Sequence, residues 1–433
     1  MRLALAAALL LIAPASAQAA WTGQELSGPH RFVDDPAVVV SPSGRALAYW
    51  DFQDGLGNRA RFGSAGATRA PGAGGFGTAV RLVPATSIRR PGAILDQIVA
   101  TRGDGALLAE RLPGAGDTVA GRLAVRFGST SGTFGKPRTI RRAAPFSIPR
   151  VSLAANAAGD AVLAWFEDRG VRSDRVYVAL RRAGHGFGKP RRLATGRIRD
   201  VEAAIGERGD ALVAWDARGV LRTRFKARGR RGFRATDTVR SMPAYFADMH
   251  PVVTPSGRAV LAWSAQFRSE GGDGGPVRFQ AATRAAGARR FARARLLETI
   301  PARAYDGLGR ALDAVADSAG VVTIAWRGGS GVRASRGGAP AQTLSAPGTT
   351  AVLSDLAAGP GGRLVAVWDG GADDAASVVR AAVAGGVGQP FGPAEDVSGP
   401  GVRFGHAGFF ADRPVVIASG RSGGRSRAQA YVR

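Results

Sequence analysis

Carboxylates and histidines recur in the segments between the apolar runs of this chain, and these residue types can act as acids, bases or metal ligands. The candidates are His30, Asp34, Asp35, Asp168, Asp248, His250, Asp306 and His406. Two carboxyl groups roughly 5–9.5 Å apart can cleave a glycosidic bond by general acid and base catalysis. No His-x-x-x-His, His-Glu-x-x-His or alternating-Asp calcium loop occurs in the sequence. We therefore expect no metal and no cofactor.

A second group of chemically active residues is basic and contiguous. Between positions 222 and 234 the basic residues are Arg222, Arg224, Lys226, Arg228, Arg230, Arg231 and Arg234. On a β-strand the first four would share one side, because side chains alternate with period two. The planar guanidinium of Arg can bind two oxygens of a phosphate, sulfate or carboxylate. These residues either bind a polyanion or pack their aliphatic side-chain carbons on a neighbouring element while the charged groups remain in solvent.

The overall charge also favours anionic partners. The 433 residues include 59 Lys+Arg against 33 Asp+Glu, a formal net charge of +26, and only three of the basic residues are lysines (Lys136, Lys189 and Lys226). Such a surplus attracts nucleic acid, acidic polysaccharide or anionic envelope polymers. The absence of cysteine excludes a disulfide scaffold, a thiolate zinc site, a Cys nucleophile and a lipid anchor on Cys.

The first nineteen residues resemble a signal peptide. A short positive start, Met1-Arg2, precedes an apolar run from Leu3 to Ile12, and Pro14 ends the run. Ala15-Ser16-Ala17 or Ala17-Gln18-Ala19 then offers a cleavage site. Because about 20 apolar residues are needed to cross a bilayer, the run is too short for a membrane anchor. We expect residues 1–19 to be removed and residues 20–433 to act in the cell envelope or outside the cell, with no transmembrane segment.

The elements that position these residues are repeats. A short apolar run, a Gly-centred turn and a strand ending in Trp recur at Trp50, Trp165, Trp215, Trp263, Trp326 and Trp368. Two degenerate copies, Ile98 to Glu110 and Ala407 to Ser419, lack the Trp. Each copy is followed by a further strand, a Gly-rich turn such as Phe187-Gly188, and a last short strand. The Trp residues are expected to pack between repeats.

Four short strands in each of eight units predict an all-β fold, a β-propeller of four-stranded blades. Seven blades remain possible if a degenerate copy is absorbed into its neighbour. The last unit lacks a fourth strand, and Thr22 to Ser27 resembles the fourth strand Gly392 to Ser398. We therefore expect residues 21–27 to complete the last blade and close the ring. In this fold the acidic loops lie on one face near the axis and the Arg-rich strand three-to-four hairpins lie on the other.

Two resemblances bear on function. Ser41-Pro-Ser-Gly-Arg-Ala-Leu-Ala-Tyr and Thr254-Pro-Ser-Gly-Arg-Ala-Val-Leu-Ala resemble the turn of TolB-like propeller repeats. In general style the chain is also similar to secreted bacterial propellers of the sialidase-like superfamily. That family uses an Arg-Ile-Pro motif and Asp boxes; here Ser147-Ile148-Pro149 lacks the Arg, and no Asp box is present. The resemblance thus implies the fold without sialidase activity.

Two functions follow from the sequence. The first is an exported, non-enzymatic binding or scaffold protein, expected to be a monomer, whose partner is a polyanionic polymer or another protein on a loop face. The alternative is a divergent glycan hydrolase or lyase with its site on the axial acidic face. A pair of convergent carboxylates near the axis distinguishes them, because the enzyme requires such a pair.

Overall fold

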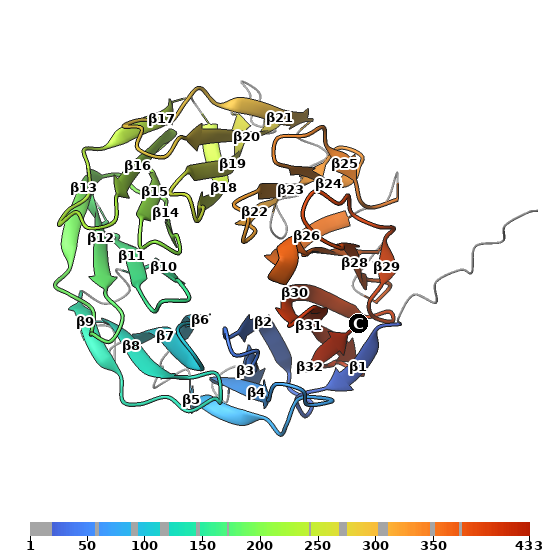
Figure 1. Cartoon of the computed structure of the whole chain (residues 1–433). Coiled ribbons are helices and arrows are strands. Elements are labelled where there is room, and N and C mark those ends of the chain that lie inside the picture. The colour runs from blue at the N-terminus through green and yellow to red at the C-terminus, as the bar shows by residue number, and fades with distance from the viewer. Residues whose placement is uncertain are drawn as a thin grey trace, which may run out of the picture.

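The chain forms a closed ring of eight four-stranded antiparallel sheets, shown along its axis in Figure 1. The computed structural model describes residues 20–56, 60–87, 94–112, 121–143, 148–170, 173–241, 244–267, 275–301, 311–346, 351–371 and 375–433. The expected all-β propeller is confirmed, with eight blades rather than seven. Among the described residues the one helical element is the 3₁₀ turn Pro360–Gly362. Residues 1–19, which we expect to be a signal peptide, lie outside this part of the chain.

The first four blades follow one another along the chain. Blade 1 contains β2 (Phe32–Val40), β3 (Ala46–Asp54), β4 (Arg61–Arg69) and β5 (Val80–Ser87). Blade 2 contains β6 (Ile94–Ala100), β7 (Gly105–Leu112), β8 (Arg122–Ser129) and β9 (Arg138–Arg142). Blade 3 contains β10 (Arg150–Ala155), β11 (Ala161–Glu167), β12 (Asp174–Arg181) and β13 (Arg191–Gly196). Blade 4 contains β14 (Asp200–Ile205), β15 (Ala211–Asp216), β16 (Val220–Lys226) and β17 (Asp237–Ser241).

The remaining blades have the same order, except that the last one borrows a strand from the other end of the chain. Blade 5 contains β18 (Ala244–Val253), β19 (Ala259–Phe267), β20 (Val277–Arg284) and β21 (Arg295–Ile300). Blade 6 contains β22 (Leu312–Ala316), β23 (Val322–Gly328), β24 (Gly331–Arg336) and β25 (Gln342–Thr343). Blade 7 contains β26 (Ala351–Ala358), β27 (Leu364–Gly370), β28 (Val378–Ala384) and β29 (Glu395–Asp396). Blade 8 contains β30 (Val402–Phe410), β31 (Arg413–Ser422), β32 (Arg425–Val432) and β1 (Thr22–Glu25).

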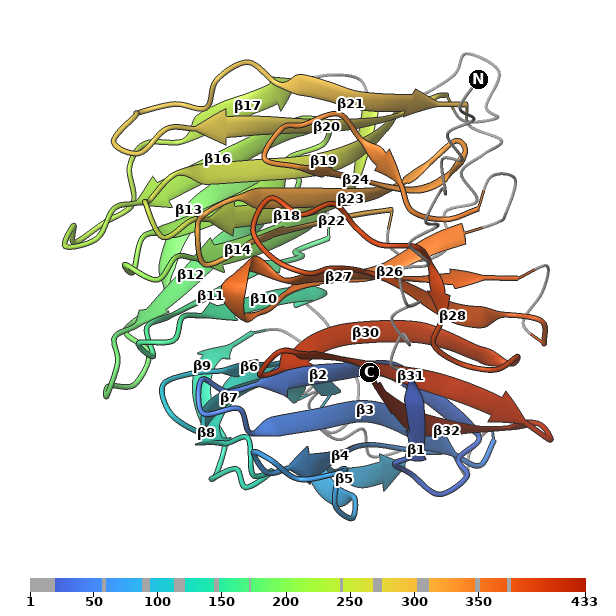
Figure 2. The same ribbon diagram turned by 45° about the vertical axis from the view of Figure 1, so that its right-hand side comes forward.

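Strand β1 closes the ring, as expected for residues 21–27. It lies beside β32 in both views (Figures 1 and 2) and pairs with it from Thr22↔Val432 to Glu25↔Gln429. The side chain of Gln24 donates to the carbonyl of Phe76 in blade 1 and accepts from its N–H, at 2.7 and 2.8 Å. Trp21 Nε1 donates to Glu395 of blade 7 at 3.0 Å. The segment thus ties blade 8 to both of its neighbours.

The recurring Trp residues pack between blades, which confirms their expected role. All six are at most 1% exposed. Each lies in an apolar cluster shared with the preceding blade; Trp165, for example, packs with Leu107 and Leu123 of blade 2. In blade 2 the corresponding position is Glu110, fully buried and bound by Arg126 Nε at 3.0 Å to both carboxylate oxygens. The degenerate copy therefore replaces apolar packing with an ion pair.

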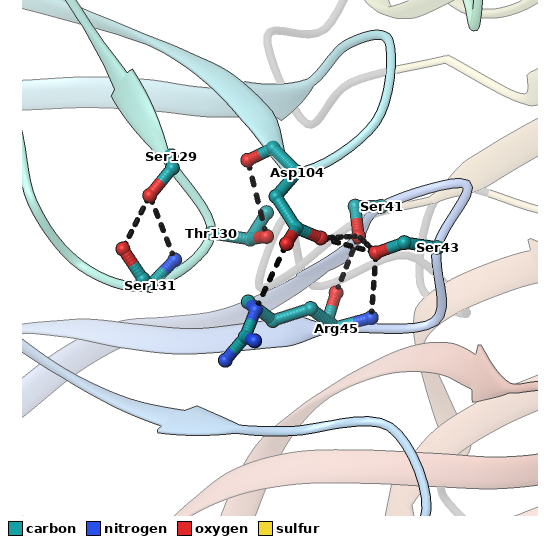
Figure 3. A network of polar contacts seen from close by, with 7 residues as sticks. All are labelled: Ser41, Ser43, Arg45, Asp104, Ser129, Thr130 and Ser131. Carbon is teal, nitrogen blue, oxygen red and sulfur yellow. Dashed lines mark hydrogen bonds and ion pairs between the residues drawn. The ribbon is translucent and has the colours of Figure 1, made fainter.

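Hydrogen bonds and ion pairs join neighbouring blades at the turns between their first and second strands. In Figure 3 the carboxylate of Asp104 in blade 2 accepts from Arg45 Nε at 3.2 Å and from the hydroxyls of Ser41 and Ser43 in blade 1. In the next turns, Arg208 donates to Ser256 O, Arg258 to Gly320 O and Arg363 to Asp412 O. Part of the large arginine content therefore holds the ring together.

The same up-and-down order in each blade sorts the loops to two faces. The innermost strands β2, β6, β10, β14, β18, β22, β26 and β30 surround the axis (Figure 1). All of them begin at one mouth of the ring, where the connections between blades and the strand two-to-three loops also lie. The first turns and the strand three-to-four hairpins lie at the opposite face. Within the described residues, no helix is long and apolar enough to cross a bilayer.

Candidate functional site

An axial cavity of about 820 Å³ opens where the inner strands begin. Its acidic, basic and histidine side chains come from seven blades and are Asp35, Asp51, Asp96, Glu202, Asp248, Asp355, His250, His406, Arg111 and Arg150. Most of them lie on the inner strands that surround the axis, whereas Asp51 of β3 and Arg111 of β7 come from second strands. We call this space the axial cavity. Six carboxylates line it.

Several polar side chains near the axis accept hydrogen bonds from backbone N–H groups of the inner strands. The inner edge of each blade carries unpaired N–H groups, which need acceptors. Asp355 accepts from Ala407 N of blade 8 at 2.8 Å. Gln97, Ser152 and Asp313 accept in the same way from the inner strand of the following blade (Leu153 N, Ala203 N and Leu356 N). These acceptors form a series of contacts between adjacent blades around the axis.

The two histidines of the cavity are oriented by carboxylates. His250 Nδ1 lies 3.0 Å from Asp313 Oδ1, and His406 Nδ1 lies 3.5 Å from Asp355 Oδ2. Their side chains are 21% and 27% exposed, so both rings reach the cavity surface. A carboxylate beside Nδ1 fixes the orientation of the ring and selects the tautomer with the hydrogen on that nitrogen.

Burial raises the pKa of three carboxyl groups in and beside the axial cavity. Burial raises the pKa of Asp51 to about 7 against the hydrogen bond from Ser64, and the charges of Asp35 and Asp96 raise it further. Burial also raises the pKa of Asp96 to about 6, although Arg111 binds its Oδ1 at 2.6 Å. Asp200, beside Arg150 at 3.2 Å, has its pKa raised by burial to about 6. The cavity therefore contains carboxyl groups that titrate near neutral pH.

Asp51→Asn is expected to stabilise the fold at high pH and to have little effect at low pH. Below about pH 4 Asp51 is protonated in both the folded and the unfolded chain. As the pH rises to about 7 only the unfolded chain releases the proton, so the parent loses stability at up to about 1.4 kcal/mol per pH unit. Urea unfolding at pH 4 and pH 8 measures this effect. The free energy of unfolding of the Asp51→Asn variant should exceed that of the parent by about 2–4 kcal/mol at pH 8 only.

The matched control is Asp168→Asn, which removes an exposed carboxyl group outside the cavity. Its effect on the free energy of unfolding should be small at both pH values. Equal effects of Asp51→Asn at pH 4 and pH 8 would contradict the assignment of a raised pKa.

The structure brings together half of the acidic and histidine candidates. Asp35, Asp248, His250 and His406 line the axial cavity. His30 instead lies at the junction of blades 8 and 1, where its Nδ1 is 3.0 Å from Asp54 and its ring stacks on Phe52. Asp34 and Asp168 do not line the cavity; Asp168 caps its own loop by accepting from Gly170 N at 2.8 Å. Asp306 lies outside the described residues.

The set of candidate loop residues missed part of the lining, namely Asp96, Glu202, Asp355, Arg111 and Arg150. For Glu202 and Asp355 the signal was register within the repeat. Glu202, His250, Asp313 and Asp355 each stand four residues before the first turn residue, which is Gly206, Thr254, Asp317 or Gly359. Alignment of the copies on this turn would have placed these side chains on one ring around the axis.

On the opposite face a basic groove of about 860 Å³ separates blades 3 and 4. Its nine cationic side chains are Arg181, Arg182, Lys189, Arg191, Arg208, Lys226, Arg228, Arg230 and Arg231, and His185 lies beside them. They come from the strand three-to-four hairpins of both blades and from the first turn of blade 4. Asp160 is the single carboxylate of the lining, and its Oδ1 accepts from Ala183 N at 2.9 Å. We call this space the basic groove.

Most of these cations are exposed, and two form the floor. Arg181 and Lys226 are half-buried, whereas Arg228, Arg230 and Arg231 are exposed. Burial, with a contribution from Arg182, lowers the pKa of the Lys226 ammonium, and burial lowers the pKa of Arg181. Nine cations around one carboxylate in this lining favour a bound anion.

The seven basic residues from 222 to 234 are divided by the fold. Lys226, Arg228, Arg230 and Arg231 line the basic groove, whereas Arg222, Arg224 and Arg234 do not. Strand β16 ends at Lys226, so Arg228 belongs to the hairpin rather than to a strand with four aligned charges. Arg224 Nε donates to Thr236 within blade 4 at 3.0 Å, and Arg234 reaches Ala288 O of blade 5 at 2.9 Å.

Among the described residues no group of three or more His, Asp or Glu is placed to hold a metal ion.

Comparison with known proteins supports the fold alone. The chain matches no protein-family model, and no curated protein matches it. Among solved structures it is similar to the Dos1 propeller, with 10% identity over 95% of each chain and a TM-score of 0.52. It is also similar to a protein of unknown function from Dyadobacter fermentans (10% identity, 95% of this chain and 97% of that one, TM-score 0.42) and to the NanB sialidase from Streptococcus pneumoniae (8% identity, 94% and 69%, TM-score 0.42). The likeness to the Dos1 propeller confirms the expected β-propeller fold.

Proposed function

We propose that this propeller is an exported, monomeric binding protein that holds a polyanionic polymer in the basic groove. The observation that carries the proposal is the lining of that groove, in which nine cationic side chains face one carboxylate already engaged by backbone. Arg predominates, and its planar fork suits phosphate, sulfate and carboxylate oxygens. The charged side chains in the lining of the axial cavity at the other face are six carboxylates and two arginines, so the two faces offer opposite charge.

The test is a titration of the parent protein with heparin and with a short DNA duplex at about 50 and 200 mM salt. Affinity from displaced counterions must fall steeply between the two salt concentrations, and for DNA the dissociation constant should be on the order of 10⁻⁴–10⁻⁶ M at physiological salt. Dextran, an uncharged polymer, is the control and should not bind. Release from a heparin column at low salt would show that the charge only keeps the protein in solution.

Export is tested separately from binding. Residues 1–19 contain the features of a signal peptide, so N-terminal sequencing of the mature protein should begin at Gln18 or Ala20. A mature chain that still begins at Met1 would contradict the export proposal and leave the groove proposal untouched.

A second candidate function is cleavage of an acidic glycan in the axial cavity. The observation that favours it is the convergence there of Asp51 and Asp96, whose pKa values are raised to about 7 and 6, with Arg111 and Arg150 available for an anionic sugar. One protonated and one ionised carboxyl group is the pairing that glycoside hydrolysis uses. Incubation with acidic polysaccharides should then release new chain ends, and Asp51→Asn should abolish the release. No release from any acidic polysaccharide would exclude this candidate.

A further inference from the structure

The basic groove has a neighbour on the same face. A second groove of about 460 Å³ lies between blades 2 and 3 and is lined by Arg102, Phe127, Gly159 and Arg181, among others, with no carboxylate in its lining. Arg181 and Ala183 line both grooves, so the two spaces meet over the strand three-to-four hairpin of blade 3. The second groove adds an exposed cation, Arg102, beyond the nine of the basic groove.

Arg181 forms the boundary between the grooves. It lies opposite Ala161 at the end of β12, donates through Nη1 to Gly159 O, and places its guanidinium 5.4 Å from the ring centre of Phe127 in blade 2. One guanidinium therefore presents positive charge to both spaces. An anionic chain that runs from the basic groove into the second groove passes this residue.

The lining indicates recognition by charge rather than by ring stacking. Within the part of the chain that the structure describes, no Phe, Tyr or Trp lines the basic groove. Phe127 in the second groove already has the guanidinium of Arg138 at 5.0 Å and that of Arg181 at 5.4 Å from its ring centre. Proteins that select single-stranded nucleic acid use exposed aromatic platforms on which bases stack. These grooves offer no such platform.

Resting on the proposed function, we propose that the ligand is a linear, flexible chain of phosphate or sulfate groups that crosses the blade 3 hairpin and occupies both grooves at once. Each groove alone holds a short segment, and a chain that reaches both gains the contacts of the second as an intramolecular event. Bases and sugar rings add nothing to this recognition. A long chain should therefore depend on Arg102, whereas a short one bound in the basic groove should not.

The experiment uses the full chain with tripolyphosphate and long-chain polyphosphate, and in parallel with a heparin disaccharide and intact heparin. Chain length alone multiplies the possible registers, so the deciding variant is Arg102→Ala, with Arg293→Ala on blade 5 as the matched loss of one exposed charge. Arg102→Ala should lower the affinity for both long polymers and reduce the magnitude of their salt slope by about 1, and leave both short ligands unchanged. Single-stranded DNA should bind no more tightly than polyphosphate at equal charge.

The outcomes separate this inference from the proposed function. If the parent binds neither long polymer, the polyanion-binding function itself fails. If the parent binds but Arg102→Ala and Arg293→Ala behave alike on the long polymers, the ligand does not enter the second groove. Tighter binding of single-stranded DNA than of polyphosphate would overturn recognition by charge alone. A difference between polyphosphate and heparin identifies the phosphate or the sulfate polymer as the better source of the chain.

Discussion

Removal of residues 20–27 should lower the melting temperature by on the order of 10 °C and expose a sheet edge that aggregates. The deletion takes away the β1–β32 ladder and the burial of Leu26, which is 6% exposed. It also removes the bonds of Trp21 to blade 7 and of Gln24 to blade 1. Each ladder bond contributes about 1 kcal/mol and a buried Leu about 2–5 kcal/mol on truncation. Thermal unfolding followed by circular dichroism, with sedimentation to detect aggregates, measures both effects.

Point variants in the same segment, residues 20–27, give the matched control. Leu26→Ala should destabilise the protein by about 2–5 kcal/mol because the side chain belongs to the apolar cluster between blades 8 and 1. Glu25→Ala should change stability by less than about 1 kcal/mol, since Glu25 and its partner Arg427 form a surface ion pair at 3.1 Å. An unchanged melting temperature after the deletion would refute closure of the ring by this strand.

Replacing Arg228, Arg230 and Arg231 with Ala should weaken polyanion binding at least about tenfold and reduce the magnitude of the salt slope by up to about 3, one for each lost contact. All three side chains are exposed in the lining of the basic groove, so their removal should leave the melting temperature nearly unchanged. Isothermal titration with a short heparin fragment at several salt concentrations gives the affinity and the slope together.

The control removes the same charge from the equivalent hairpin of the next blade. Arg289, Arg290 and Arg293 are exposed on blade 5 and do not line the basic groove. Their replacement by Ala lowers the net charge by the same three units and should reduce binding far less. If the two triple variants lose affinity equally, binding follows the overall charge and the groove has no special role.

The fold could be predicted because every repeat carries the same local signals. The Gly-centred turn and the terminal Trp mark the first two strands of a blade, and burial of Trp50 and Trp165 between blades follows from their shared position. Closure by residues 21–27 could be predicted from the missing fourth strand of the last repeat. Glu110 was harder to interpret. Its ion pair with Arg126 takes the place of the apolar packing of Trp, and the repeat pattern does not predict this pairing.

The candidate sites could be predicted only in part. Assignment of acidic loops to one face located Asp35, Asp248, His250 and His406, but side chains inside the inner strands, such as Asp96 and Asp355, depend on register and bulges. The basic run was divided for a similar reason. Once β16 ends at Lys226, the hairpin carries Arg228, Arg230 and Arg231 into the groove, whereas Arg222 and Arg224 are half-buried on β16 and do not line it. The cations that blade 3 adds to the basic groove could not be predicted in the same way, because they reach the groove only when the hairpins of blades 3 and 4 lie side by side in the ring.

Acetylation of the three lysines with and without a short heparin fragment tests the central claim most directly. Lys189 and Lys226 line the basic groove, and Lys136 is exposed on the strand three-to-four hairpin of blade 2, outside that lining. A polyanion bound in the groove should slow acetylation of Lys189 and Lys226, measured by mass spectrometry, and leave Lys136 unchanged. Equal protection of all three lysines, or protection of none while the fragment is bound, would contradict the account.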